Sequence, residues 1–158
     1  MLNSLAREIA NACYLVSSRV RQFKKSFPEA RVLAAGATRA RKLQKDSPLQ
    51  YEPGWITARR GVLILTETGL HCGDWTIPLN TIREATLSNV AGGSVLKIAT
   101  ADEQYYQFGL QQDPAWEQQK VLPLKIQKAE LQFSTASVIM RLFVLAFSIA
   151  SLLRGISL

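Results

Sequence analysis

The stretch Gly61-Val62-Leu63-Ile64-Leu65-Thr66-Glu67-Thr68-Gly69-Leu70 decides the fold class of this chain. Its run of β-branched and apolar residues lies between two glycines, a pattern typical of a buried strand that ends in a turn. Similar short runs follow at intervals of about ten residues, with turn residues between them. They cover residues 70–77 (interrupted by Gly73-Asp74), 82–87, 95–100 and 105–110. The pattern predicts an antiparallel sheet bent into a small barrel or sandwich.

Two features follow the last of these runs. Asp113-Pro114 is typical of a helix start, because proline suits the first position of a helix, and Trp116 behind it is expected in the core. Residues 121–133 are expected to give a last extended strand.

We therefore assign the chain to the α+β class, mainly β, in three parts. These are a basic amphipathic helical arm (1–46), a β-domain (47–133) and an apolar helix (134–158).

The positive charge of the chain is concentrated near its beginning. The 158 residues have a net charge of +7. Residues 1–45 contain ten basic and two acidic residues, whereas residues 46–158 contain nine basic and ten acidic ones. A basic excess of this kind indicates phosphate-bearing partners, either an anionic membrane surface or nucleic acid.

The arm has the periodicity of an amphipathic helix. Apolar residues recur at steps of three and four from Leu2 to Phe27, and Pro28 is expected to end this helix. Residues 29–45 are rich in alanine and basic residues and predict a second helix. Such helices suit the headgroup layer of an anionic membrane. Packing on the domain or on a partner helix, and a mitochondrial transit segment, stay open as alternatives.

The last part of the chain is strongly apolar. Residues 142–153 contain no charged residue, and residues 138–140 extend the run beyond Arg141. With residues 134–137 added, the length suits a helix that spans or half inserts into a bilayer. Serines and Arg141 share one stripe of this helix, which suits contact with another helix in lipid. Packing against its own domain and an oligomer interface stay open as alternatives.

Three segments of the β-domain resemble GRAM and bacterial PH-like domains. Residues 61–70 resemble the opening hairpin, Ile77-Pro78-Leu79-Asn80-Thr81-Ile82 resembles the IPL-x-x-I strand lead-in, and residues 94–98 with Tyr106-Gln107-Phe108 resemble the next hairpin. The order also resembles a group of largely uncharacterised bacterial PH-like membrane proteins in which a similar core precedes an apolar tail. The resemblance covers residues 55–120. It implies two near-orthogonal sheets capped by a helix, with a role in lipid or partner binding and no catalysis.

The sequence offers little that suits catalysis. His71 is the only histidine, and it and Cys72 have no further metal ligands at usable spacing, so strand packing accounts for both. Cys13 lies on the apolar stripe of the arm and is expected to be a small buried residue, with palmitoylation as an alternative. Asp102-Glu103 has the pattern of an exposed hairpin tip. We therefore expect no enzyme, catalytic residue, cofactor or metal.

These observations favour a non-catalytic docking module that associates with the cytoplasmic face of a membrane. Its partner would be membrane lipid, a membrane protein or both. One alternative is a structural or assembly subunit of a membrane complex. Another is a nucleic-acid binder that acts through the basic arm, which the lack of interleaved aromatic residues disfavours. The residues expected to contact the membrane or anionic lipid are Arg19, Arg21, Lys24, Lys25, Arg39, Arg41, Lys42, Arg141, Phe143, Leu145, Ile149 and Leu152.

Overall fold

The computed structural model describes residues 2–47, 50–51, 55, 57–90, 92–129, 132–133 and 139. The chain divides into two compact units, the first formed by Met1–Ser47 and Ala58–Glu130 and the second by Pro48–Thr57 and Leu131–Leu158. In the second unit, β2 (Gln50–Tyr51) and β10 (Gln132–Phe133) pair in parallel. The predicted apolar helix at 134–158 falls outside the described residues except for Ile139. None of the helices in the described part of the chain is long and apolar enough to span a bilayer.

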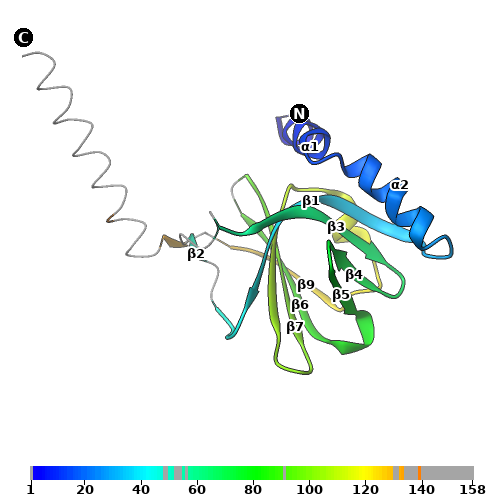
Figure 1. Cartoon of the computed structure of the whole chain (residues 1–158). Coiled ribbons are helices and arrows are strands. Elements are labelled where there is room, and N and C mark those ends of the chain that lie inside the picture. Colours follow the sequence, from blue (N-terminus) through cyan, green and yellow to red (C-terminus); the bar gives the residue numbers. More distant parts are fainter. Residues whose placement is uncertain are drawn as a thin grey trace, which may run out of the picture. The chain divides into compact units, whose positions relative to one another are not determined.

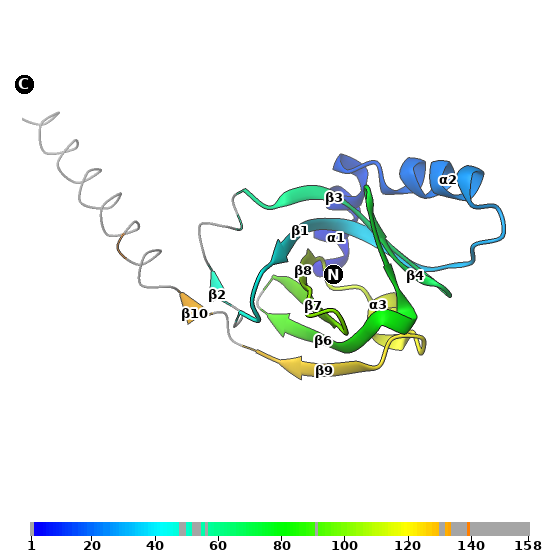
Figure 2. The ribbon, with the colours of Figure 1, turned by 60° about the horizontal axis from the view of Figure 1, so that its bottom comes forward.

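An eight-stranded sheet forms most of the first unit (Figure 1). Its strands are β1 (Val32–Leu43), β3 (Arg59–Thr66), β4 (Gly69–Cys72), β5 (Trp75–Pro78), β6 (Ile82–Val90), β7 (Gly93–Thr100), β8 (Tyr105–Leu110) and β9 (Leu124–Lys128). They are ordered β5-β4-β3-β1-β8-β7-β6-β9. Neighbours are antiparallel except β6 and β9, which are parallel and make the sheet mixed. The sheet curls around its core and stays open, with β5 and β9 at its edges (Figure 2).

The mainly β fold class is confirmed, and so are the strands that the sequence predicts between residues 62 and 110. Gly73, with φ +65°, forms the predicted turn between β4 and β5. The turn between β6 and β7 is shorter than the glycine-rich stretch suggests, because β6 continues to Val90 and β7 begins at Gly93. The last extended strand is also shorter than predicted, since β9 covers only Leu124–Lys128.

The prediction of a second helix over residues 29–45 is wrong. These residues contain β1, which lies in the middle of the sheet between β3 and β8. Alanine favours helices, but backbone pairing on both sides of β1 outweighs that preference. The small alanine side chains pack on both faces of β1. Ala34 and Ala40 belong to the main core, and Ala37 belongs to a second cluster on the opposite face.

The amphipathic arm forms two helices where the sequence predicts one. They are α1 (Leu2–Cys13) and α2 (Val16–Ser26). Leu15, at the junction, has left-handed backbone angles (φ 53°, ψ 41°), which interrupt the helix and redirect the chain. α2 ends just before Pro28, as predicted, and the N–H of Phe27 donates to the carbonyl of Phe23.

The sheet packs on both faces. The core face carries the main core, in which Leu63, Leu65 and Phe108 are fully buried. The short helix α3 (Pro114–Gln118) adds Trp116 to this core, and Asp113 caps the helix by accepting the N–H of Ala115 at 3.0 Å. The helix start and the buried tryptophan that the sequence predicts are therefore confirmed.

The outer face is the opposite one, and it carries the second cluster beneath α2.

Candidate functional site

α2 lies on the outer face of the sheet with its apolar side inward. Val16 is 6% exposed and packs with Val62 and Ile64 of β3. Val20 and Phe23 are half-buried against the same cluster. The basic residues of α2 remain in water, and all four of those predicted to contact lipid are exposed: Arg19, Arg21, Lys24 and Lys25. α2 therefore has the ordinary arrangement of an amphipathic helix that packs on a folded domain.

α1 has a different arrangement, in which its larger apolar residues are exposed. Leu5 and Ile9 are each 56% exposed. On the side of α1 that contacts the domain, the polar residues Arg7 and Asn11 lie one helical turn apart. Ala10 and Tyr14 pack beside them against the second cluster. The Arg7 guanidinium lies 3.3 Å from the Asp113 carboxylate, and the Asn11 side-chain oxygen accepts the backbone N–H of Ala37 at 3.2 Å.

The surface beneath α1 explains this orientation. β1 pairs with β3 from Val32 onward, but with β8 only from Thr38, because β8 ends at Leu110. The N–H of Ala37 therefore lies beyond the last pair with β8 and donates to the Asn11 side-chain oxygen of α1. Asp113 lies at the same end of β8, with its carboxylate facing Arg7. The polar groups beneath α1 thus account for the inward position of Arg7 and Asn11.

The larger apolar residues of α1 consequently face away from the domain. We call Leu5, Ile9 and Leu15 the outer apolar surface; Leu15, at the junction of the two helices, is 63% exposed. Cys13 is exposed as well, so the prediction that it is buried is wrong. The reason is the turn at Leu15, which separates α1 from the part of the stripe that packs on the sheet.

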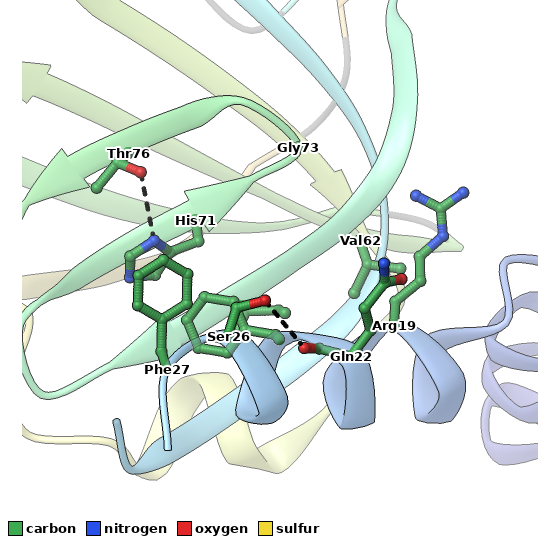
Figure 3. A pocket seen from close by; sticks show the side chains of 10 residues that line it. Arg19, Gln22, Ser26, Phe27, Val62, His71, Gly73 and Thr76 are labelled. Atoms are coloured by element: carbon green, nitrogen blue, oxygen red, sulfur yellow. Dashed lines mark hydrogen bonds between the residues drawn. The ribbon is translucent and has the colours of Figure 1, made fainter. Parts of the chain in front are cut away.

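A groove of about 410 Å³ lies between α2 and strands β3 to β5 (Figure 3). The His71 ring lies in it, 4.8 Å from the Phe23 ring and 6.1 Å from the Phe27 ring, centre to centre. The Nδ1 and Nε2 atoms of His71 lie 3.4 Å from the hydroxyls of Thr76 and Thr66. Burial lowers the pKa of His71. These contacts hold the His71 ring between α2 and the neighbouring strands.

Cys72 has no sign of reactivity. It is buried in the main core, and burial raises the pKa of its thiol to about 11; Arg59 and Arg19 lower that pKa and Asp74 raises it, with smaller effects. Among the described residues, no group of three or more histidine, cysteine, aspartate and glutamate side chains could hold a metal ion.

The remaining predicted contact residues that the structure describes differ in exposure. On β1, Arg39 is exposed, but Arg41 is buried, and its guanidinium donates to the Gln107 side-chain oxygen at 3.0 and 2.7 Å. Lys42 is exposed, with its ammonium 5.6 Å from the centre of the Tyr106 ring. Five predicted residues lie outside the described part of the chain: Arg141, Phe143, Leu145, Ile149 and Leu152.

Sequence reasoning did not identify Arg7 and Asn11 as the residues that attach α1 to the domain. Their position off the apolar stripe was visible, but it shows only which side of the helix is polar.

No protein-family model matches the chain, and no curated protein matches its sequence.

Proposed function

We propose that this protein is a non-catalytic docking module that binds the surface of an anionic membrane through α1 and α2. The outer apolar surface carries the proposal, because a folded domain gains nothing by turning the apolar side of a helix toward water. A bilayer interface is a partner that accepts this side while the polar side of α1 stays attached to the sheet.

The charge around this surface favours lipid headgroups. α2 adds four exposed cations, and Glu8 is the only acidic residue in the two helices. Each cation near an anionic leaflet contributes about 1 kcal/mol, and burial of each half-exposed leucine or isoleucine in the interface contributes about 1 kcal/mol more. Together these contributions are enough for reversible binding of a folded domain.

Two further parts of the proposal rest on the sequence. The PH/GRAM-like resemblance assigns a lipid- or partner-binding role to the β-domain, and its segments form the β3–β4 and β7–β8 hairpins and the entry to β6. The apolar residues 134–158 would provide a second attachment at the cytoplasmic face of the membrane. Tethering by one attachment raises the local concentration of the other, so two weak attachments bind strongly together.

The test uses the exposed cysteine of α1 in the full-length chain. An environment-sensitive fluorophore attached to Cys13 should shift its emission to the blue with vesicles of phosphatidylcholine and phosphatidylserine, because α1 enters the interface. The double substitution Leu5→Glu and Ile9→Glu should weaken this response at least about tenfold, which corresponds to about 1.4 kcal/mol. Ile126→Glu is the matched control, since Ile126 is a 51% exposed isoleucine on β9.

Two results would count against the proposal. The first is a fluorophore at Cys13 that stays in water while the chain binds vesicles, which would assign membrane binding to other residues. The second is binding only in the presence of a membrane protein, which would favour the assembly-subunit function, with a partner helix on the outer apolar surface.

A further inference from the structure

Two arginines on neighbouring strands lie directly opposite each other. Arg39 of β1 is in register with Arg60 of β3, and both are exposed. Side chains alternate between the faces of a strand. Arg60 precedes Val62 by two residues, so this pair lies on the outer face, beyond the part that α2 covers.

The charge of this pair is not balanced within the described residues. Like charges directly opposite each other destabilise a sheet. Neither Arg39 nor Arg60 forms an ion pair with any described residue, although five other cations do. Those five pairs are Arg7–Asp113, Arg31–Glu67, Arg59–Asp74, Lys97–Asp46 and Lys125–Glu84. Asp74 is the acidic residue nearest in sequence to the end of β4, and it already forms an ion pair with Arg59.

A third guanidinium lies on the same side of the sheet. Arg19, near the start of α2, stands beside Val62, with its guanidinium turned away from the His71 end of the groove (Figure 3). Arg19 also has no ion pair among the residues that the structure describes. The outer face therefore carries three guanidinium groups, those of Arg39, Arg60 and Arg19, that have no ion pair within the described part of the chain.

We propose that Arg39 and Arg60 together bind one phosphate monoester group, presented by the headgroup of an anionic membrane lipid. Directly opposite residues on antiparallel strands have Cβ atoms about 4.5–5.5 Å apart, so two guanidinium groups can converge on one tetrahedral anion. Each guanidinium donates two parallel N–H groups to such oxygens. A monoester carries a charge of about −1.5 to −2 at neutral pH, which balances the pair.

The position of the pair links it to the proposed function, on which the lipid source of the phosphate rests. Asn11 of α1 contacts β1 at Ala37, and Arg39 is two residues further along that strand. The distance is about 7 Å at the rise of a β-strand. A bilayer that accepts the outer apolar surface of α1 would therefore have its headgroups beside the arginine pair.

The experiment compares two charge-matched double variants of the full-length chain. Arg39→Gln with Arg60→Gln removes the pair, while Arg83→Gln with Lys120→Gln removes two exposed cations elsewhere. In thermal unfolding, glycerol 3-phosphate should raise the Tm of the wild type and the control, but not that of the pair variant, because a ligand stabilises only the state that binds it. Glycerophosphocholine, a diester, should have less effect at the same ionic strength.

The second arm uses vesicles. Phosphatidic acid in phosphatidylcholine should bind the wild type and the control at least about tenfold better than phosphatidylserine at equal surface charge, and the pair variant should lose this preference. Arg19→Gln should have a smaller effect of the same kind. The pair variant should fold, since it loses a repulsion between like charges.

The outcomes separate the two proposals. Equal responses of the pair variant and the control in both arms would overturn the phosphate site and leave membrane docking by α1 intact. A Tm response to glycerol 3-phosphate without vesicle binding by the wild type would support the site, but overturn its lipid source and the proposed function. Tighter, pair-dependent binding of duplex DNA than of phosphatidic acid vesicles would overturn the assignment to lipid.

Discussion

α1 and α2 have the same kind of sequence and opposite orientations. Both are amphipathic, and their apolar residues belong to one stripe that runs through the sequence from Leu2 to Phe27. α2 lies over Val62 and Ile64 and turns its apolar side inward. α1 instead turns Arg7 and Asn11 inward, toward Asp113 and a backbone N–H of β1, and leaves its larger apolar residues exposed. The surface beneath an amphipathic helix, and not the pattern of the helix alone, decides which side is buried.

The largest expected difference is in thiol reactivity, between Cys13 on α1 and Cys72 in the main core. A maleimide should label Cys13 of the folded protein at least about a hundredfold faster than Cys72, because thiolate and access are both needed for reaction. Cys13 is exposed on α1, while Cys72 is buried with a pKa near 11. Mass spectrometry of the labelled peptides measures both rates. Fast labelling of both cysteines in native buffer would show that the main core opens; slow labelling of both would show that α1 is covered.

The next largest difference is in the free energy of unfolding. Val16→Ala should lower it by about 1–3 kcal/mol, since this side chain is buried between α2 and β3. Ile9→Ala, which removes more carbon from α1, should change it by less than about 0.5 kcal/mol. Urea unfolding followed by circular dichroism compares the two variants. A large loss for Ile9→Ala would mean that α1 packs its apolar side inward in solution, and the comparison between the helices would then fail.

The smallest expected difference depends on pH and concerns only α2. Because burial lowers the pKa of His71, the folded state binds its proton less readily than the unfolded state, whose pKa is near 6.5. Stability should therefore be unaffected by this group above about pH 7 and should fall as the pH drops through 6.5 and below. The Tm of His71→Gln should fall less than that of the wild type between about pH 7.5 and 5. Identical acid profiles would show that the Phe23 contact imposes no constraint on the charge of His71.

The strands from β3 to β8 could be predicted because local signals agree there. Runs such as Val62–Leu65 are both β-branched and bounded by glycine, and Gly73-Asp74 marks a turn that the backbone needs. Asp113 and Pro114 specify the start of α3 in the same local way. In each case the residues that predict the strand, turn or helix start are the same residues that form it, so the local sequence is enough to predict it.

The remaining features depend on residues far apart in the chain. β1 is a strand because β3 and β8 pair with it, and nothing within residues 29–45 indicates those partners. The orientation of α1 depends on where β8 ends, and the opposition of Arg39 and Arg60 depends on the register between β1 and β3. The sequence identified Arg39 as a contact residue by its charge but had no signal for Arg60 as its neighbour.

Asp113 has one further consequence. Its carboxylate both caps α3 and faces Arg7, while Trp116, two residues into that helix, stands near the backbone of Gly36 beneath α1. Movement of the first helix at a surface would thus alter the surroundings of a buried indole. We therefore expect the fluorescence of Trp116 to change when α1 moves, so that emission would report on an event at the outside of the fold.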